Sequence, residues 1–325
     1  MQSFALWYEK RNQNDTEKAS VILNFNLWTE CKWDRSYFDI GLKVDKLNLI
    51  DKINFFFPFE INENKSEIND LGKTLKEANV TSAIFNENYS VTEKVQGKLL
   101  DVSNIEKQIV FNVYELDINE NIDLEKLSDG TLLSIKIQGN PSLEDLTTSV
   151  YFRFRIAKSD FKEMIHEYSA NKGGLQNLIN STSTVDFRLN NVRSLNSTLL
   201  EKIEAKNNSY FEMKSIHFLL MIKSHVQLQS SGYVNARKLE SDIWNDYVEF
   251  NNIKENTEDI IAYHYKYIFD KSKDYDLFVK YTVEKTIFWK YFWCTILLGA
   301  LGSILGNIIS KIPCWLYQLS NLTKK

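Results

Sequence analysis

The chain has 325 residues, of which 43% are hydrophobic and 25% are charged, and its net charge at pH 7 is −4. This composition is typical of a globular protein. It excludes collagen-like and low-complexity chains and argues against broad non-specific binding to nucleic acid. The three cysteines form no CxxC pair and the four histidines (His166, His217, His225 and His264) are scattered, so no disulfide framework, metal site or cofactor is indicated.

The N-terminus does not have the pattern of a signal peptide. Residues 1–10 lack a basic cluster followed by a long apolar run. We therefore expect the N-terminal part of the chain to stay in the cytosol. Lysine far outnumbers arginine and asparagine is abundant, which favours a bacterial source.

Apolar and polar residues alternate along much of the first 230 residues, which is the period of a half-buried β-strand. Strands are predicted at residues 21–27, 38–44, 53–57, 108–116, 133–137, 149–156, 184–189 and 211–228. Helices are predicted here at residues 66–78 and 159–169, too few for a doubly wound parallel sheet. The expected fold class is α+β, with a strand-rich, mainly antiparallel cytosolic sensing domain over residues 1–230.

Most of the few arginines are close together in the sequence. In their predicted strand, Arg153 and Arg155 point to one face and phenylalanines to the other. If this strand pairs with the one that holds Arg188, three guanidinium groups line a surface that can bind a phosphate or an oligonucleotide, with Tyr151 available for stacking. The alternative is a solvated strand face with ion pairs to Asp186 and its neighbours.

From residue 231 the apolar residues recur every four positions, as in Leu239, Ile243 and Tyr247. This spacing predicts amphipathic helices that form a linker or stalk over residues 231–286. The last of them begins near Asp274 and runs directly into a more apolar segment, which would couple the two parts of the chain stiffly.

Residues 291–310 carry no charged side chain. A helix of this length spans roughly 30 Å, the thickness of the hydrocarbon core of a bilayer. Aromatic residues flank the segment on both sides, as they do at membrane–water interfaces. One transmembrane helix is therefore predicted over residues 287–311, and the alternative is a buried core helix.

One face of this predicted helix carries small and polar residues, and we call it the small-residue face. It comprises Gly299, Gly302, Ser303, Gly306, Asn307 and Ser310. Glycines spaced by three and four residues allow a second helix to approach closely, and a membrane-embedded asparagine seeks a partner on another helix. We expect self-association through this face, and its polar line permits a narrow ion path.

Pro313 is expected to end the helix, because proline removes a backbone donor and clashes with the preceding turn. Residues 312–325 then form an interfacial tail that ends in two lysines. Lysines are balanced on the two sides of the apolar segment, so the orientation rests on the missing signal peptide. Together with the apolar segment and the composition, these features predict a single-pass protein of the bacterial inner membrane with a cytosolic N-terminal domain.

This layout, a strand-rich cytosolic part followed by a C-terminal anchor, resembles the membrane effectors of bacterial anti-phage defence systems, in particular the HalA-like components of the Hailong type. The layout carries the resemblance, and no residue role is transferred from it. The resemblance implies a homo-oligomeric ion channel or pore that is gated by a nucleotide or oligonucleotide second messenger. It also implies a nucleotidyltransferase partner, and growth arrest or death by depolarisation.

Two other functions stay open at the level of sequence. The first is a tail-anchored adaptor or scaffold that binds another protein and makes no pore. The second is a membrane-bound enzyme, but no catalytic motif is found, and the sequence predicts no enzymatic activity.

Overall fold

The computed structural model describes residues 2–31, 33–94, 98–144, 146, 148–168, 180–250, 253–270, 272–284 and 288–322. The chain divides into two compact units, which are described separately. The first consists of residues 1–167 and 183–282 and is built mainly of strands. The second consists of residues 168–182 and 283–325 and contains one long helix.

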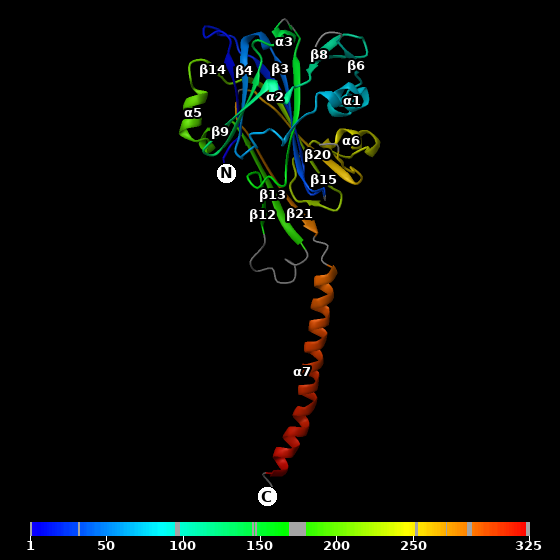
Figure 1. Cartoon of the computed structure of the whole chain (residues 1–325). Helices are drawn as coiled ribbons and strands as arrows, with labels where there is room; N and C mark the ends of the chain where they lie inside the picture. The colour runs from blue at the N-terminus through cyan, green and yellow to red at the C-terminus, as the bar shows by residue number, and fades with distance from the viewer. Residues whose placement is uncertain are drawn as a thin grey trace. The chain divides into compact units, whose positions relative to one another are not determined.

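A ten-stranded sheet forms the centre of the first unit (Figure 1). Its strands lie in the order β17 (Asn235–Lys238), β20 (Ile260–Ile268), β15 (Glu212–Lys223), β2 (Ser20–Trp28), β3 (Ser36–Asp45), β11 (Val150–Lys158), β8 (Ile109–Tyr114), β7 (Leu99–Ser103) and β6 (Ser90–Glu93), with β5 (Ile68–Asp70) paired to β11. The pairs β2–β15 and β8–β11 are parallel, whereas the other described pairs in this sheet are antiparallel.

Smaller sheets pack around this one. A five-stranded sheet has the order β14 (Asn208–Ser209), β1 (Ala5–Lys10), β4 (Ile50–Phe57), β10 (Gly130–Lys136) and β9 (Ile122–Leu127). A four-stranded sheet has the order β12 (Ile165–Tyr168), β13 (Asn180–Leu189), β21 (Tyr275–Glu284) and β16 (Gln227–Leu228), and β18 (Glu249–Phe250) pairs with β19 (Ile253–Lys254).

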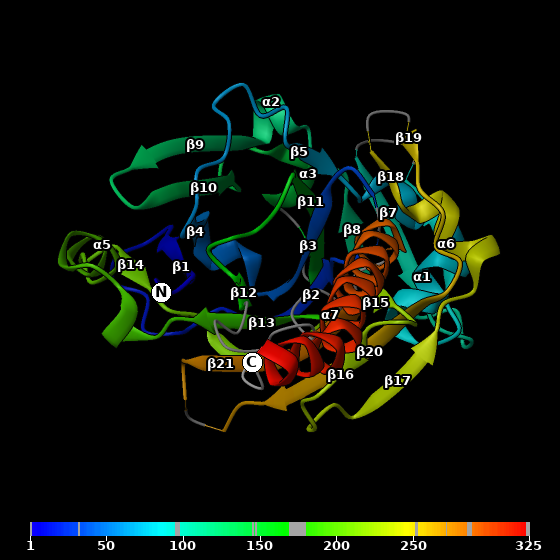
Figure 2. The ribbon, with the colours of Figure 1, turned by 90° about the horizontal axis from the view of Figure 1, so that it is seen from below.

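The helices of the first unit are short. They are α1 (Ala78–Phe85), α2 (Ile118–Asn121), α3 (Pro141–Glu144), α5 (Ser197–Ile203) and α6 (Ser241–Tyr247), with 3-10 turns η1 (Leu47–Leu49), η2 (Lys73–Lys76) and η3 (Val192–Ser194). α5 lies beside β14, on the opposite side of the unit from α1 and α6 (Figures 1 and 2).

Buried phenylalanines join the three larger sheets into one core. The ring of Phe25 in β2 lies 5.5 Å from that of Phe38 in β3, 6.1 Å from Phe55 in β4 and 5.0 Å from Phe187 in β13. All four side chains are fully or almost fully buried. Since each buried phenylalanine contributes roughly 2 kcal/mol, this cluster is a main source of the stability of the fold.

The predicted fold class is confirmed, because the chain is rich in strands, its sheets are antiparallel or mixed, and an apolar helix follows at the C-terminus. A strand overlaps each of the eight predicted strand segments. The match reflects the alternation itself, which places every second side chain in the core.

The two predicted helices of the N-terminal region are wrong. Residues 66–78 form β5, the turn η2 and the first residue of α1. The Asp70 carboxylate accepts hydrogen bonds from the backbone of Gly72, Lys73 and Leu116, which bends the chain after three strand residues. Residues 159–168 form a turn and β12, because Phe161 and Met164 are pulled into the core, and Ser169 lies outside the described residues.

The predicted helical linker over residues 231–286 is also wrong. Among its described residues only α6 is helical, and β20 pairs with β15 along its whole length. The predicted helix from Asp274 is the strand β21, so the strand-rich region extends well beyond residue 230, and residues 285–287 lie outside the described part. The spacing misled the prediction because four is a multiple of two. Ile261, Tyr265 and Phe269 share one face in a strand as well as in a helix.

The second unit contains α7 (Phe288–Leu322). Its stretch Phe292–Ser310 is long and apolar enough to cross a membrane and is not buried at all, so it is not a core helix of this chain. The expected break at Pro313 is wrong, because the helix continues past it. Proline removes a single backbone donor, and the backbone hydrogen bonds of the other residues continue the helix to Leu322. An interfacial position for residues 312–325 stays a prediction, and residues 323–325 lie outside the described part.

Gly41 occupies the middle of β3, directly across from Arg153 of β11. A Cβ atom at this position would lie 2.1 Å from the hydroxyl oxygen and 2.7 Å from Cζ of Tyr151, whose side chain crosses over the glycine. Glycine is needed here because another side chain occupies the space above its backbone.

We therefore expect Gly41→Ala to lower the free energy of unfolding by roughly 1–3 kcal/mol, the usual cost of overpacking. Urea unfolding of the full-length protein in detergent, followed by tryptophan fluorescence, measures the change. Ser36→Ala at the start of the same strand is the control and should have little effect. Equal stability of Gly41→Ala and the wild type would contradict the close approach of Tyr151.

Candidate functional site

Arg153 and Arg155 lie on one face of β11, as the alternation predicted, but both side chains are completely buried. Both the ligand-binding surface and the solvated strand face predicted from the sequence require this face to be exposed. In the structure α6 covers it with Trp244 and Tyr247, which belong to the same core cluster as Tyr151. The strand is therefore buried on both faces.

Arg155 forms a bidentate ion pair with Asp39 of β3, which lies directly opposite it in the sheet. Its Nε donates to Asp39 Oδ1 at 2.6 Å and its Nη2 donates to Oδ2 at 3.0 Å. The same Oδ2 accepts from Trp28 Nε1 and from the Tyr247 hydroxyl, both at 2.8 Å. Burial raises the pKa of Tyr247, so its hydroxyl keeps the proton that it donates.

Arg153 is bound by uncharged groups. Its Nε donates to the Tyr247 hydroxyl at 2.8 Å and its Nη1 to the Tyr151 hydroxyl at 2.6 Å. With the Asn26 amide oriented to satisfy both of its neighbours, Nη2 donates to the amide oxygen at 2.7 Å. All three nitrogens of this guanidinium group therefore have partners inside the protein.

This buried cluster holds two guanidinium groups against one carboxylate. The faces of aromatic rings stabilise the excess positive charge, since Arg155 Cζ lies 4.7 Å from the Tyr37 ring centroid and Arg153 Cζ lies 5.5 Å from that of Tyr247. We call Asp39, Arg153, Arg155 and Tyr247 the buried arginine network. Its donors are occupied and inaccessible, so the predicted ligand-binding surface of Arg153, Arg155 and Tyr151 is not formed.

Arg188 lies apart from that network in the sheet topology. Its strand β13 pairs with β12 and β21 and not with β11. The guanidinium forms a bidentate pair with Asp186, at 3.0 and 2.7 Å, and contacts Ser194. For this arginine the alternative of an ion pair with Asp186 is confirmed.

Removal of the single acid from the buried arginine network should be costly. We expect Asp39→Asn to lower the free energy of unfolding by about 3–5 kcal/mol, because two buried cations lose their counter-charge. Thermal and urea unfolding of the full-length protein report the change through the fluorescence of Trp28 and its neighbours. Asp259→Asn, which breaks the exposed pair with Lys238, is the matched control and should change stability little. A small effect of Asp39→Asn would show that the network is not a main determinant of the fold.

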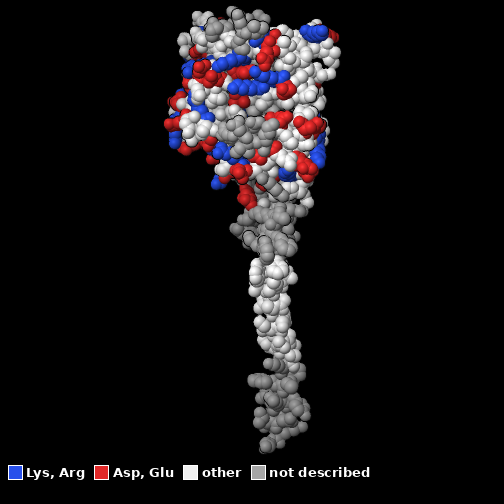
Figure 3. Space-filling model, turned by 45° about the vertical axis from the view of Figure 1, so that its right-hand side comes forward, with Lys and Arg blue, Asp and Glu red and all other residues white. Residues whose placement is uncertain are grey.

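In α7, the small-residue face is open along its length. A Cβ atom added at Gly299, Gly302 or Gly306 would meet nothing within 4 Å. The Ser310 hydroxyl donates to the backbone oxygen of Asn307 at 3.0 Å, so the helix itself satisfies this donor. Within the described part of the chain, the Asn307 amide has no hydrogen-bond partner. The charges that are interspersed over the first unit are absent from the described middle of α7 (Figure 3).

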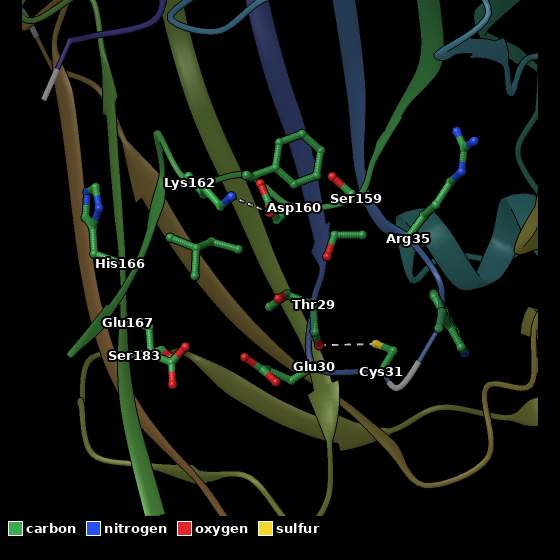
Figure 4. Close-up of a pocket in the computed structure, with 14 residues that line it drawn as sticks. Thr29, Glu30, Cys31, Arg35, Ser159, Asp160, Lys162, His166, Glu167 and Ser183 are labelled. Carbon is green, nitrogen blue, oxygen red and sulfur yellow. Dashed lines mark hydrogen bonds and ion pairs between the residues drawn. The ribbon is translucent and has the colours of Figure 1, made fainter. Parts of the chain in front are cut away.

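One hollow of the first unit has a volume of about 620 Å³ (Figure 4). Both acidic and basic side chains line it, so its charge favours neither an anion nor a cation. Its one thiol, Cys31, donates to the Thr29 carbonyl at 3.2 Å, and burial raises its pKa, which leaves it unreactive. Among the described residues no group of three or more histidines, cysteines, aspartates and glutamates is placed to hold a metal ion.

A second hollow, of about 400 Å³, was missed by the sequence analysis. His217 and His264, which are 47 residues apart and looked scattered, meet in it because β15 pairs with β20. Arg237 and Lys266 line it as well. Apolar and polar residues alternate around each histidine, which could have predicted a strand at both positions. The spacing of four favoured a helix around His264, and alternation does not show which strands pair.

No protein-family model matches the chain, and no curated protein is similar enough in sequence to indicate a relative. The site must therefore be interpreted from its own chemistry.

Proposed function

We propose that this protein is a membrane effector that self-associates through the small-residue face of α7 and conducts ions under the control of its strand-rich unit. The observation that carries the proposal is a long apolar helix, Phe292–Ser310, with no cover in its own chain and with glycines and an unpaired asparagine on one face. Close helix packing and asparagine pairing both need a second helix. Because α7 is the only described helix of this kind, a second copy of the chain supplies it.

A conducting path in this proposal would follow the polar side chains of the small-residue face. The Ser310 hydroxyl donates within its own helix but keeps its acceptor lone pairs, so Ser303, Asn307 and Ser310 can all face the path, and the Asn307 amide is the most polar group of the three. Rings of polar side chains from several copies are one way in which channels replace the hydration shell of an ion. Asn307 is therefore the residue on which the pore proposal depends most.

Control by the strand-rich unit would pass through β21, which ends at Glu284 and is held in a sheet by β13 and β16. Because residues 275–284 form the strand β21, no stiff helical stalk is proposed between the two units. A location in the bacterial inner membrane, a role in anti-phage defence, a nucleotide or oligonucleotide signal and a nucleotidyltransferase partner belong to the same proposal and rest on the resemblance in layout.

Reconstitution into liposomes tests the pore. We expect the full-length protein to dissipate an ion gradient or a membrane potential, and Asn307→Leu to reduce the flux to near background because it removes the polar group. Ile308→Leu, roughly 180° around the helix from Gly299, is the control and should conduct like the wild type. Equal flux through the wild type and Asn307→Leu would place any conducting path elsewhere.

Light scattering in detergent tests self-association independently of conduction. We expect a particle several times the 38.1 kDa chain mass, and a shift towards the monomer for Gly302→Leu, because a bulky side chain prevents close approach of the helices. Ile308→Leu again serves as the control.

A tail-anchored adaptor or scaffold is the competing function, and the same two measurements separate it from a pore. An adaptor gives no flux under any ligand condition, whatever its size in detergent. A monomeric wild type without flux would falsify the proposed effector.

A further inference from the structure

The second hollow lies on the same face of the ten-stranded sheet as the buried arginine network. In the sheet register Asn24 pairs with Gly41 and with His217, and His217 pairs with Lys266. Paired residues of neighbouring strands point to the same side, so this face carries polar side chains across five strands. α6 covers one part of it, and the hollow of about 400 Å³ is a second part that stays open.

The hollow is basic. Lys43 from β3, Arg237 from β17 and Lys266 from β20 line it, and the one acidic lining residue is Glu87, which accepts a hydrogen bond from the Tyr89 hydroxyl. None of the three cations forms an ion pair with a described acid. Three cations against one acid give this concavity an excess of positive charge in a protein of net charge −4, which favours an anionic ligand.

Two histidines lie in the same hollow and hydrogen-bond to each other. His217 Nδ1 lies 3.1 Å from His264 Nε2, and the rings are stacked. Burial, the neighbouring His264 and Lys266 lower the pKa of His217 to about 4, so it is neutral at pH 7. His217 Nε2 also lies 3.3 Å from Ser215 Oγ, so both ring nitrogens of His217 are occupied within the protein, and the lysines and Arg237 are left to bind phosphate oxygens.

Aromatic side chains form the other wall. Phe85 at the end of α1 and Tyr89 after it line the hollow, with ring centroids 6.0 Å apart, and both stay partly exposed. Such a wall accommodates a planar ring by stacking or edge contact. Asn24 Oδ1 is buried at the floor and has no hydrogen-bond partner among the described residues, so it is an acceptor left for a ligand N–H.

We propose that this hollow binds a small ligand that carries both a phosphate group and a planar ring with N–H donors. Lys43, Arg237 and Lys266 bind the phosphate, Phe85 and Tyr89 contact the ring, and Asn24 accepts from its edge. A volume of about 400 Å³ is within the range of small-molecule sites, roughly 300–1,000 Å³. The site does not depend on the proposed pore, because all of its residues belong to the strand-rich unit.

Calorimetric titration of the full-length protein in detergent tests the site, with adenosine 5′-monophosphate, inorganic phosphate and adenosine as probes. We expect the monophosphate to bind more tightly than phosphate alone, and adenosine to bind most weakly. Lys266→Gln should weaken binding of the monophosphate by about tenfold or more, the usual effect of losing a charged partner. Arg237→Gln should do the same.

Lys238→Gln is the matched control. It removes the same charge from the adjacent position of β17, where the side chain points to the other face of the sheet and pairs with Asp259. Arg237 also donates to the Ala83 carbonyl at 2.9 Å, so Lys266→Gln, whose side chain is exposed, decides the test if Arg237→Gln fails to fold. Absence of binding into the millimolar range, or equal weakening by Lys238→Gln and Lys266→Gln, overturns the proposal. Flux through α7 is measured separately, so failure of the pore leaves this result intact.

Discussion

The carboxylate of Asp39 is fully buried and accepts hydrogen bonds from three side chains that come from three different elements. Arg155 belongs to β11, Trp28 to β2 and Tyr247 to α6, so this one group fixes the register of two strands and the position of a helix. A buried charge is tolerated only when it is paired and hydrogen-bonded, and the cost of leaving it unpaired enforces this arrangement. The hydrogen bond from Tyr247 to Asp39 therefore helps to hold α6 over the sheet.

The face of the ten-stranded sheet that carries Asp39 has two parts, one covered by α6 and one open. Where α6 covers the face, its polar groups pair among themselves and contribute to the fold. Farther along the same strands, towards His217 and Lys266, three cations and one acid line an open hollow. The planar guanidinium group of Arg155 suits its buried bidentate pair with Asp39, and the flexible ammonium group of Lys266 suits a site that is partly open to water.

The strand alternation allowed eight strand segments of the first 230 residues to be predicted, because period two is unambiguous when apolar residues such as Val21, Leu23, Phe25 and Leu27 alternate with polar ones. The same logic failed where apolar residues recurred every four positions, since that spacing fits a helix and a strand alike. Ile260–Ile268 became a strand because β15 offered a complete set of backbone partners. A local pattern does not contain that information.

For the candidate sites, the sequence by itself determined the apolar helix and its small-residue face, because a charge-free stretch long enough to cross a bilayer needs no partner to be recognised. It also placed Arg153 and Arg155 on one face of a strand. Only the tertiary structure decided that α6 buries this face. It also decided that the cations lining the second hollow are Lys43, Arg237 and Lys266, which come from three distant segments. The physical reason is that side-chain direction is a local property of the backbone, whereas burial and charge pairing depend on which strands become neighbours.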